Sequence, residues 1–312
     1  MRILVVGAGA IGGYFGARLL QAGRDVTFVV RQRRAGELRR HGLSVRSQFG
    51  DVRIETPPTI LAENLSEPFD LILLSCKAYD LDGAIASFAP AVGTGTTILP
   101  LLNGMRHMDV LEGRFGADRI IGGLCLISTT LDEAGGILHL NDIHALSFGE
   151  RAGQKTPRIE AINEILINAG FDARLSPEIM QAMWEKWVFI ASAAGITCLM
   201  RAAIGDIVAA GGGELALQSL DECAAIAAAN GFAPRAAAID RNRAVLTAVG
   251  SSLTASMLRD IERGAKTEGD HILGDLLRRG GEMGTPALLL RAANAHLAAY
   301  EARRSREAQV QA

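Results

Sequence analysis

Residues 2–12 read Arg-Ile-Leu-Val-Val-Gly-Ala-Gly-Ala-Ile-Gly, and this stretch decides the fold. Its first five residues are almost all apolar and predict a buried strand, which three glycines follow with the spacing G-x-G-x-x-G. Gly7 allows a tight turn out of the strand, and Gly9 lets a pyrophosphate approach the backbone. Gly12 lets the next helix pack closely on the strand. The stretch therefore predicts a dinucleotide-binding turn.

The context of the glycines strengthens this interpretation. A helix is expected from Gly13 to Ala22, and a second strand from Asp25 to Val30. The free N–H groups where the helix begins, around Ala10 and Ile11, are expected to bind the phosphates. The alternative is an ordinary tight turn between a strand and a helix, which would not require this succession of elements.

Length and composition limit the classes of function. A chain of 312 residues suggests two domains. A net charge of −2 gives no basic field for nucleic acid. The four cysteines form no Cys-x-x-Cys pair, which argues against a disulfide framework or a zinc site and for a reducing compartment.

No targeting or membrane segment is expected. The first strand begins at Arg2, which leaves no room for a signal peptide. The longest apolar run, Trp187–Met200, is shorter than the ~18 residues that a transmembrane helix needs. We expect a cytoplasmic protein and a buried core helix at this run.

Strands and helices alternate in the first half of the chain. Strands are predicted at 2–6, 25–30, 71–76, 97–101, 120–126, 137–140 and 145–148, with a hairpin of 44–46 and 52–54 around Gly50. Further helices are predicted at 35–41, 82–89 and 110–115. This α/β pattern is typical of a Rossmann-type doubly wound, mostly parallel sheet.

After about Pro177 the chain becomes alanine-rich and helical in its periodicity. Helices are predicted at 178–200, 214–230, 234–249, 252–263, 268–279 and 287–304, with Thr267 and Thr285 as N-caps of the last two. We therefore expect a dinucleotide-binding domain at 1–177 and an all-α substrate and catalytic domain at 178–312. The apolar helical domain is compatible with a homodimer, although no feature of the sequence requires one.

The residues after the second strand indicate which nicotinamide cofactor binds. NAD-specific sites usually place an acid there to hold the ribose 2′-hydroxyl. This chain has Arg31-Gln32-Arg33-Arg34 instead, and guanidinium groups suit a 2′-phosphate. The sequence thus favours NADP(H) over NAD, although a solvated basic loop would also explain the charges.

Trp184-Glu185-Lys186-Trp187 begins the long helix of the second domain. A lysine between tryptophans can donate a proton and stabilise an alkoxide when it is partly desolvated. The alternative is a lysine that snorkels from an amphipathic helix, which the local sequence alone would favour.

At this point the chain resembles the ketopantoate reductase family (2-dehydropantoate 2-reductase, the ApbA/PanE type) over nearly its whole length. The matching motifs are the glycine turn with Gly13, Arg31, Lys77 in Cys-Lys-Ala-Tyr-Asp, Asn103 in Leu-Asn-Gly-Met, Trp-Glu-Lys at 184–186, Ser256 in Ser-Met-Leu-Arg-Asp, and Thr267-Glu268 with Gly274. The resemblance implies NADPH-dependent reduction of a 2-oxo acid to a 2-hydroxy acid, the activity used in pantothenate biosynthesis.

The resemblance also implies a role for each matched residue. Lys186 matches the catalytic lysine, the proton donor and alkoxide stabiliser, and Glu268 matches a glutamate that positions cofactor and substrate. Asn103 matches a strand-end asparagine near nicotinamide and substrate. Lys77 matches a lysine near the cofactor, and Ser256 a serine that binds the substrate carboxylate.

Three positions depart from the family pattern. Members that reduce ketopantoate carry asparagines where this chain has Ile190, Ala194 and Leu253. The loss of hydrogen-bonding partners costs affinity for a polar substrate. We therefore expect a less polar 2-oxo acid or ketone and poor turnover of ketopantoate.

Other functions stay open on the sequence alone. A 3-hydroxyacid or 6-phosphogluconate-type dehydrogenase also has a catalytic lysine, but it places an asparagine where this chain has Ile190. A catalytically silent NADP-binding sensor fits the lost asparagines but not the retained Lys186 and Glu268. Glu268-Gly-Asp-His271 resembles part of a metal site, yet no third ligand accompanies it, and we expect no metal.

Overall fold

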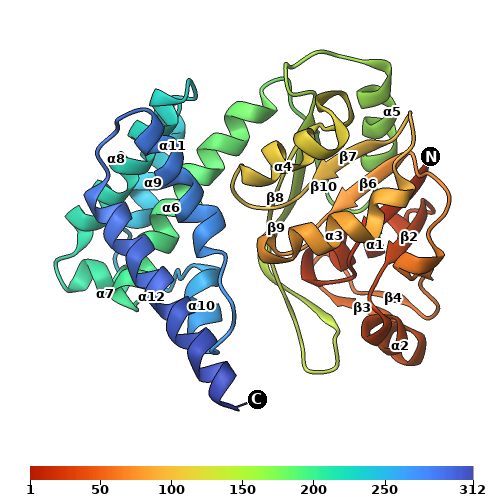
Figure 1. Ribbon diagram of the computed structural model, residues 1–312, viewed down its shortest axis with the longest axis horizontal. Helices are drawn as coiled ribbons and strands as arrows, with labels where there is room; N and C mark the ends of the chain where they lie inside the picture. The colour runs from red at the N-terminus through yellow and green to blue at the C-terminus, as the bar shows by residue number, and fades with distance from the viewer. Residues whose placement is uncertain (312) are drawn as a thin grey trace. The chain divides into compact units, whose positions relative to one another are not determined.

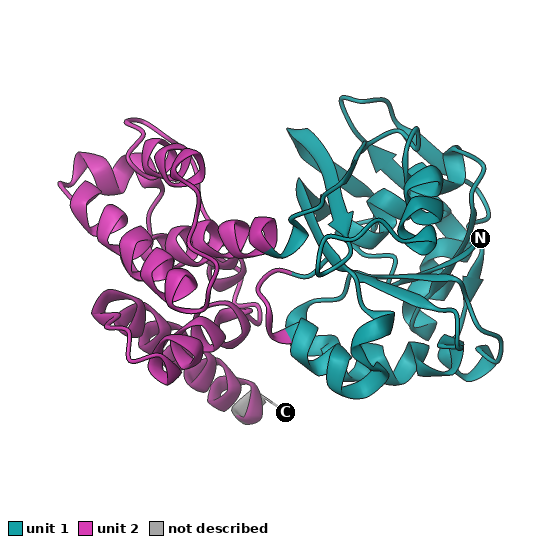
Figure 2. Cartoon of the chain, turned by 90° about the horizontal axis from the view of Figure 1, so that it is seen from above, with its two compact units in different colours: residues 1–102, 107–180 teal, residues 103–106, 181–312 magenta. Residues whose placement is uncertain are grey.

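The computed structural model describes residues 1–311, and its contacts divide the chain into two compact units. Unit 1 comprises Met1–Leu102 and His107–Met180, and unit 2 comprises Asn103–Arg106 and Gln181–Ala312 (Figure 2). The short segment Asn103–Arg106 therefore belongs by its contacts to the helical unit. The domain boundary after residue 177 stays a prediction.

A parallel five-stranded sheet forms the first half of unit 1. Its strands are β1 (Arg2–Val6), β2 (Asp25–Val29), β5 (Thr59–Ile60), β6 (Leu71–Leu74) and β7 (Thr97–Pro100), in the order β5-β2-β1-β6-β7. Val6 pairs with both Val29 and Leu74, so the carboxyl ends of the three central strands lie level. The predicted doubly wound sheet is confirmed, and its strand order reverses beside β1.

A second sheet lies in the same unit, and the sequence did not indicate it. Its strands are β3 (Leu43–Arg46), β4 (Val52–Ile54), β8 (Gly122–Leu131), β9 (Ile137–Gly149) and β10 (Asp172–Leu175). The predicted hairpin is confirmed as β3 and β4. The predicted strands 137–140 and 145–148 are one continuous strand, β9, which pairs antiparallel with β8.

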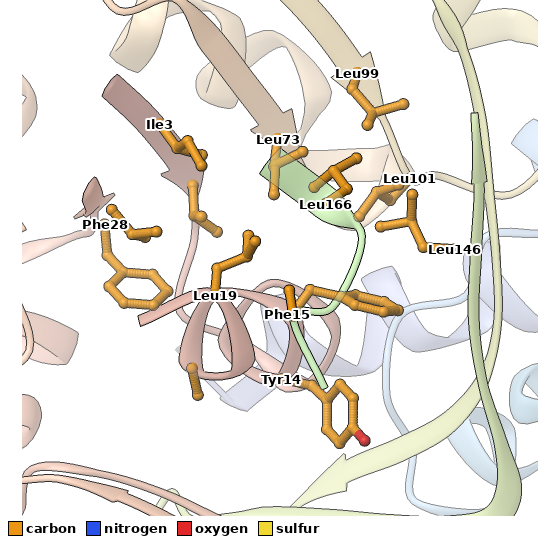
Figure 3. Close-up of a cluster of buried hydrophobic side chains, with 14 of the residues drawn as sticks. Ile3, Tyr14, Phe15, Leu19, Phe28, Leu73, Leu99, Leu101, Leu146 and Leu166 are labelled. Carbon is orange, nitrogen blue, oxygen red and sulfur yellow. The ribbon is translucent and has the colours of Figure 1, made fainter. Parts of the chain in front are cut away.

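Helix α1 (Ala10–Gln21) packs against both sheets. An added Cβ at Gly16 would meet the ring of Phe28 on β2, and one at Gly13 would meet Ile137 on β9. Figure 3 shows Phe15 and Leu19 of α1 among the leucines of this core. The other helices of this part of the chain are α2 (Gln32–His41), α3 (Leu81–Phe88), α4 (Arg106–Phe115) and α5 (Pro157–Leu166), with single 3-10 turns at Ala62–Asn64, Ala78–Asp80, Ala89–Ala91 and Ala117–Arg119.

Helices make up unit 2 (Figure 1). They are α6 (Ile179–Met200), α7 (Ile204–Ala209), α8 (Gly213–Ala229), α9 (Ala236–Leu246), α10 (Ser256–Glu262), a π-helical turn (Asp270–Gly274), α11 (Asp275–Glu282) and α12 (Leu288–Gln311). Helix α8 packs on both α11 and α12, and Leu220, Leu276 and Leu290 of these helices are fully buried. The predicted all-α second domain is confirmed.

Both predicted N-caps are wrong. The amide and hydroxyl of Thr267 donate to Glu301 on α12, at 2.6 and 2.8 Å, and the helix begins after Glu268. Helix α12 begins at Leu288, and the carboxylate of Glu222 on α8 accepts the amides of Leu289 and Leu290.

Among the described residues, no helix combines the length and the apolar composition needed to cross a membrane.

Candidate functional site

The glycine turn after β1 has the geometry that its sequence predicts. Gly7 adopts a φ of +89°, in the left-handed region, and its amide donates to the Val29 carbonyl at 3.0 Å. A Cβ added at Gly9 would meet no atom within 4 Å, so open space adjoins the backbone there. A Cβ at Gly12 would strike the Ser75 hydroxyl and the Gly7 carbonyl, so only glycine allows α1 to approach β1 and β6 this closely.

The N-terminus of α1 presents backbone amides. Its first helical hydrogen bond runs from the Gly13 amide to the Gly9 carbonyl at 2.8 Å, so Ala10, Ile11 and Gly12 have no intrahelical acceptor. The cap residue Gly9 brings no side chain, and the first turn holds no acidic residue. This end of the helix can accept a phosphate, and the open space at Gly9 leaves room for it.

Basic side chains follow the two strands that flank β1. Arg31 comes after β2, is 78% exposed and forms an ion pair with Asp80 at 3.1 Å. Lys77 comes after β6 and is also exposed. Because parallel strands end at one edge of the sheet, both cations lie at the edge that carries the glycine turn.

Arg34 has a different role from the one the basic cluster suggested. Its Nε donates to the Ala8 carbonyl at 3.0 Å and its Nη2 to the Gly135 carbonyl at 2.9 Å. Only 15% of its side chain is exposed, whereas 88% of the Arg33 side chain is. Arg34 therefore fastens the glycine turn to the β8–β9 turn, and Arg31 and Arg33 are the arginines of this cluster that are open to solvent.

In unit 2, two tryptophans fix the part of α6 that carries Lys186. Trp184 stacks on Phe232 at 5.2 Å between ring centroids. The indole N–H of Trp187 donates to the Ile272 carbonyl at 2.9 Å. Lys186 itself is half-buried between the two tryptophans. This position is compatible with a partly desolvated ammonium group, and also with a lysine that buries its aliphatic stem while its charge reaches water.

Glu185 anchors the same turn from its other side. Its carboxylate accepts both Nε and Nη2 of Arg235 at 2.7 Å, and also the Gln181 amide at 3.1 Å. Burial alone would raise the pKa of Glu185, but the hydrogen bonds from Arg235 and Gln181, together with the charge of Arg235, outweigh burial and hold that pKa below its ordinary value. The turn that bears Lys186 is therefore held rigidly.

The π-helical turn Asp270–Gly274 brings further predicted residues together. The His271 ring is hydrogen-bonded to the backbone of Asn103, and Arg106 forms an ion pair with Asp270 at 2.7 Å. The carbonyl of Glu268 accepts the amide of Ile272, whose own carbonyl accepts Trp187. The segments that carry Asn103, Lys186 and Glu268 thus all contact this one turn.

Ser256 is not joined to that group by a described interaction. It is the exposed first residue of α10, and no described hydrogen bond or ion pair links it to Asn103, Lys186 or Glu268. Leu253, three residues earlier, is half-buried, and its carbonyl accepts the Ile204 amide at 3.0 Å.

On α6, Ile190 is half-buried and Ala194 is buried. One and two turns beyond Lys186, this helix therefore offers aliphatic side chains in place of amides.

The sequence did not predict a role for His271, whose ring contacts the Asn103 segment. The Glu268-Gly-Asp-His271 spacing drew notice only as a fragment of a metal site, and the structure forms no cluster of three or more ligand side chains within residues 1–311. Burial lowers the pKa of His271, the carboxylates of Glu268 and Asp275 oppose that shift, and Arg106 adds to it.

The fold and these features define a two-unit protein with a Rossmann-type dinucleotide turn and a helical unit that carries a rigidly held lysine. The family model for ketopantoate reductase PanE/ApbA matches residues 3–153, and its C-terminal model matches residues 178–301. The chain belongs to the ketopantoate reductase family.

Individual relatives are similar over nearly the whole chain. It is 36% identical to the uncharacterized oxidoreductase YkpB of Bacillus subtilis (strain 168), over 97% of this chain and 99% of that protein. The crystal structure of 2-dehydropantoate 2-reductase from Geobacter metallireducens GS-15 matches with a TM-score of 0.86 and 30% identity, over 95% of this chain and 99% of that one. A ternary structure of D-mandelate dehydrogenase with NADH and anilino(oxo)acetate shares the fold, with a TM-score of 0.87 and 21% identity over 98% and 100% of the chains.

Proposed function

We propose that this protein reduces a 2-oxo acid to a 2-hydroxy acid with NADPH. The observation that carries the proposal is the environment of Lys186 in a chain of this family. Lys186 is half-buried on α6 between Trp184 and Trp187, and both tryptophans are held by contacts with other segments. The glycine turn supports it from unit 1, because Gly9 leaves open space beside unpaired helix amides that suit a dinucleotide phosphate. Arg31 and Lys77 are proposed to hold the cofactor.

When bound, the nicotinamide supplies a hydride to the carbonyl carbon of the substrate. Lys186 then stabilises the negative charge that develops on the carbonyl oxygen and transfers its ammonium proton to it, which leaves the 2-hydroxy acid. Asn103 and Glu268 are proposed to orient the substrate and the nicotinamide, and Ser256 to bind the substrate carboxylate.

The aliphatic side chains of Ile190, Ala194 and Leu253 support a substrate without the hydroxyl group of ketopantoate. Each replaces an amide that could have formed a hydrogen bond with that hydroxyl. A site built to hydrogen-bond a substrate group can discriminate by up to ~10⁴-fold against a substrate that lacks the group, whereas an apolar site cannot. We therefore propose a 2-oxo acid with an apolar side chain.

The first test is a screen of NADPH oxidation over ketopantoate and 2-oxo acids with small aliphatic, branched and aromatic side chains. We expect the highest kcat/KM for an apolar substrate and poor turnover of ketopantoate. Efficient ketopantoate reduction would refute the substrate proposal while leaving the reaction class intact. Tight NADPH binding with no turnover of any 2-oxo acid would favour a silent binding protein instead.

The second test removes the proposed proton donor. Lys186→Ala should lower kcat by about 10²- to 10⁴-fold, the usual contribution of a general acid, while NADPH still binds. Lys155→Ala, an exposed lysine of unit 1, is the control for loss of one positive charge. Retention of most activity in Lys186→Ala would refute the assignment of the donor.

The homodimer and the cytoplasmic location remain predictions, and sedimentation of the purified chain tests the first of them.

A further inference from the structure

His271 is a buried histidine that the proposed reaction leaves without a role. It lies in the π-helical turn Asp270–Gly274, and 7% of its surface is exposed. Single π turns inside helices are rare and occur frequently at functional sites. This one begins two residues after the proposed site residue Glu268.

The imidazole holds the chain segment that carries Asn103. Its hydrogen bond to the Asn103 backbone favours the protonated ring, so the imidazole is the donor and the Asn103 carbonyl the acceptor. Gly104, with a φ of +77°, packs directly against the ring: a Cβ at Gly104 would lie 3.1 Å from Cδ2 and 3.3 Å from Nε2 of His271. The ion pair between Arg106 and Asp270 fastens the other end of the same segment.

The other side of the π turn is fastened to α6. The Trp187 indole donates to the carbonyl of Ile272, the residue after His271, at 2.9 Å. Trp187 is the immediate neighbour of Lys186. One π turn therefore holds the Asn103 segment on one side and the Lys186 segment on the other.

Building on the proposed function, we propose that His271 is a positioning residue that fixes Asn103 relative to Lys186 and Glu268. It acts through the Asn103 backbone and does not itself touch the substrate. Misplacement of reacting groups by about 1 Å costs on the order of 10²-fold in rate, so loss of this support should damage turnover without changing the chemistry.

The charge state of the ring suits this role. Burial lowers the pKa of His271, and Glu268, Asp275 and Arg106 are the charged groups that face it. The imidazole is therefore neutral near pH 7, and its single N–H donates to Asn103 while its ring packs on Gly104.

The test compares His271→Ala with His271→Gln, whose amide N–H can still reach a carbonyl. In His271→Ala we expect kcat with the best 2-oxo acid to fall by about 10²-fold, with the Kd of NADPH unchanged. His271→Gln should recover much of this loss. Equal losses in both variants, or an unchanged kcat in His271→Ala, would overturn the proposal.

A second readout does not depend on finding a substrate. Hydrogen exchange of the amides at 103–106 should accelerate in His271→Ala and return toward the parent rate in His271→Gln, while exchange at 184–187 changes little. Unchanged exchange at 103–106 would overturn the positioning role even in an active enzyme. If the parent protein reduced none of the 2-oxo acids, only the proposed function would be refuted. Hydrogen exchange would still show whether His271 holds the segment 103–106.

Discussion

Arg31 is the residue on which the predicted preference for NADPH depends. It follows β2 at the place where NAD-specific sites carry an acid, and its side chain is mostly exposed. Its observed partner is Asp80, in the turn after β6, at 3.1 Å. A 2′-phosphate would therefore compete with Asp80 for the guanidinium.

Arg31→Ala should raise the KM for NADPH by about 10- to 100-fold, because this is what the loss of a hydrogen bond to a charged group usually costs. The KM for NADH should stay nearly unchanged, because NADH has no 2′-phosphate. Asp80→Asn should lower the KM for NADPH by a few-fold at most, because exposed ion pairs contribute ~1 kcal/mol or less. Arg40→Ala, at the far end of α2, is the control for charge. Equal effects of Arg31→Ala on both cofactors would contradict an Arg31–phosphate contact.

The neighbouring Arg34 shows where residue-level prediction stops. The sequence grouped it with Arg31 and Arg33, because all three follow the same strand. The acceptors that decide its role are the carbonyls of Ala8 and Gly135, which lie 26 and 101 residues away along the chain. A sequence shows that a residue is charged, but it does not show which distant carbonyl groups will accept its hydrogen bonds.

At the scale of elements, Gly12 is the point where α1 meets the sheet. Gly12→Ala should destabilise the protein by about 1–3 kcal/mol, because its Cβ would strike the Gly7 carbonyl and the Ser75 hydroxyl, and backbone cannot move aside cheaply. It should also weaken NADPH binding, since the displaced turn is the proposed phosphate site. Urea unfolding and NADPH titration measure the two effects.

Gly36→Ala is the matched control for that substitution. Gly36 also lies in a helix, α2, and a Cβ there would meet no atom within 4 Å. This variant should gain about 0.5–1 kcal/mol from the lower entropy of its unfolded chain. A loss of stability in Gly36→Ala equal to that in Gly12→Ala would show that the contact with Ser75 and Gly7 is not the cause.

Local elements were predictable, and helix ends were not. The first strand, the glycine turn and α1 follow from consecutive residues, so the sequence contains everything that decides them. Thr267 looked like a cap, but its hydroxyl donates to Glu301, 34 residues later. The start of α12 is capped by Glu222, which lies 67 and 68 residues before the amides it accepts. A carboxylate from another helix takes the place of the local cap that the sequence suggested.

At the scale of the molecule, the two-part α/β and all-α architecture followed from a change in periodicity, but the second sheet did not. Its strands β3, β9 and β10 pair in parallel although they lie far apart in sequence. Helix α1 packs against β3, β4, β8 and β9 of this sheet as well as against β1 and β2 of the parallel sheet. Such pairing reflects tertiary contacts that no window of sequence contains.

Each unit also contains a buried histidine whose pKa is lowered by its burial, and this histidine should contribute to the response of that unit to acid. His144 of unit 1 bonds to the Tyr14 hydroxyl at 2.8 Å and stacks on Phe49. Burial lowers the pKa of His144; Asp172 opposes that shift, and His139 and Arg18 add to it. Burial likewise lowers the pKa of His271 in unit 2.

The sign of the pH dependence follows from these shifts. A histidine in the unfolded chain binds a proton near pH 6.5, whereas the buried ring binds one only at lower pH. The unfolded state therefore gains protons first. The contribution of these two histidines to stability is constant above about pH 6.5 and falls as the pH drops from there toward the folded-state pKa values. Each histidine contributes at most about 1.4 kcal/mol per pH unit. Glu185 and Glu301, whose pKa values are lowered, reduce stability only below about pH 4.5.

Tryptophan fluorescence can separate the two units in this experiment. The chain has two tryptophans, Trp184 and Trp187, and both lie in unit 2 with His271. Urea unfolding followed by fluorescence should show a loss of stability in the parent protein as the pH falls below about 6.5, and His271→Gln should flatten that slope. His144→Gln should leave the fluorescence-detected slope unchanged if the units unfold separately, and should flatten it as well if they unfold together. A fluorescence-detected slope that His271→Gln does not change would show that His271 is not the group that links the stability of the helical unit to pH.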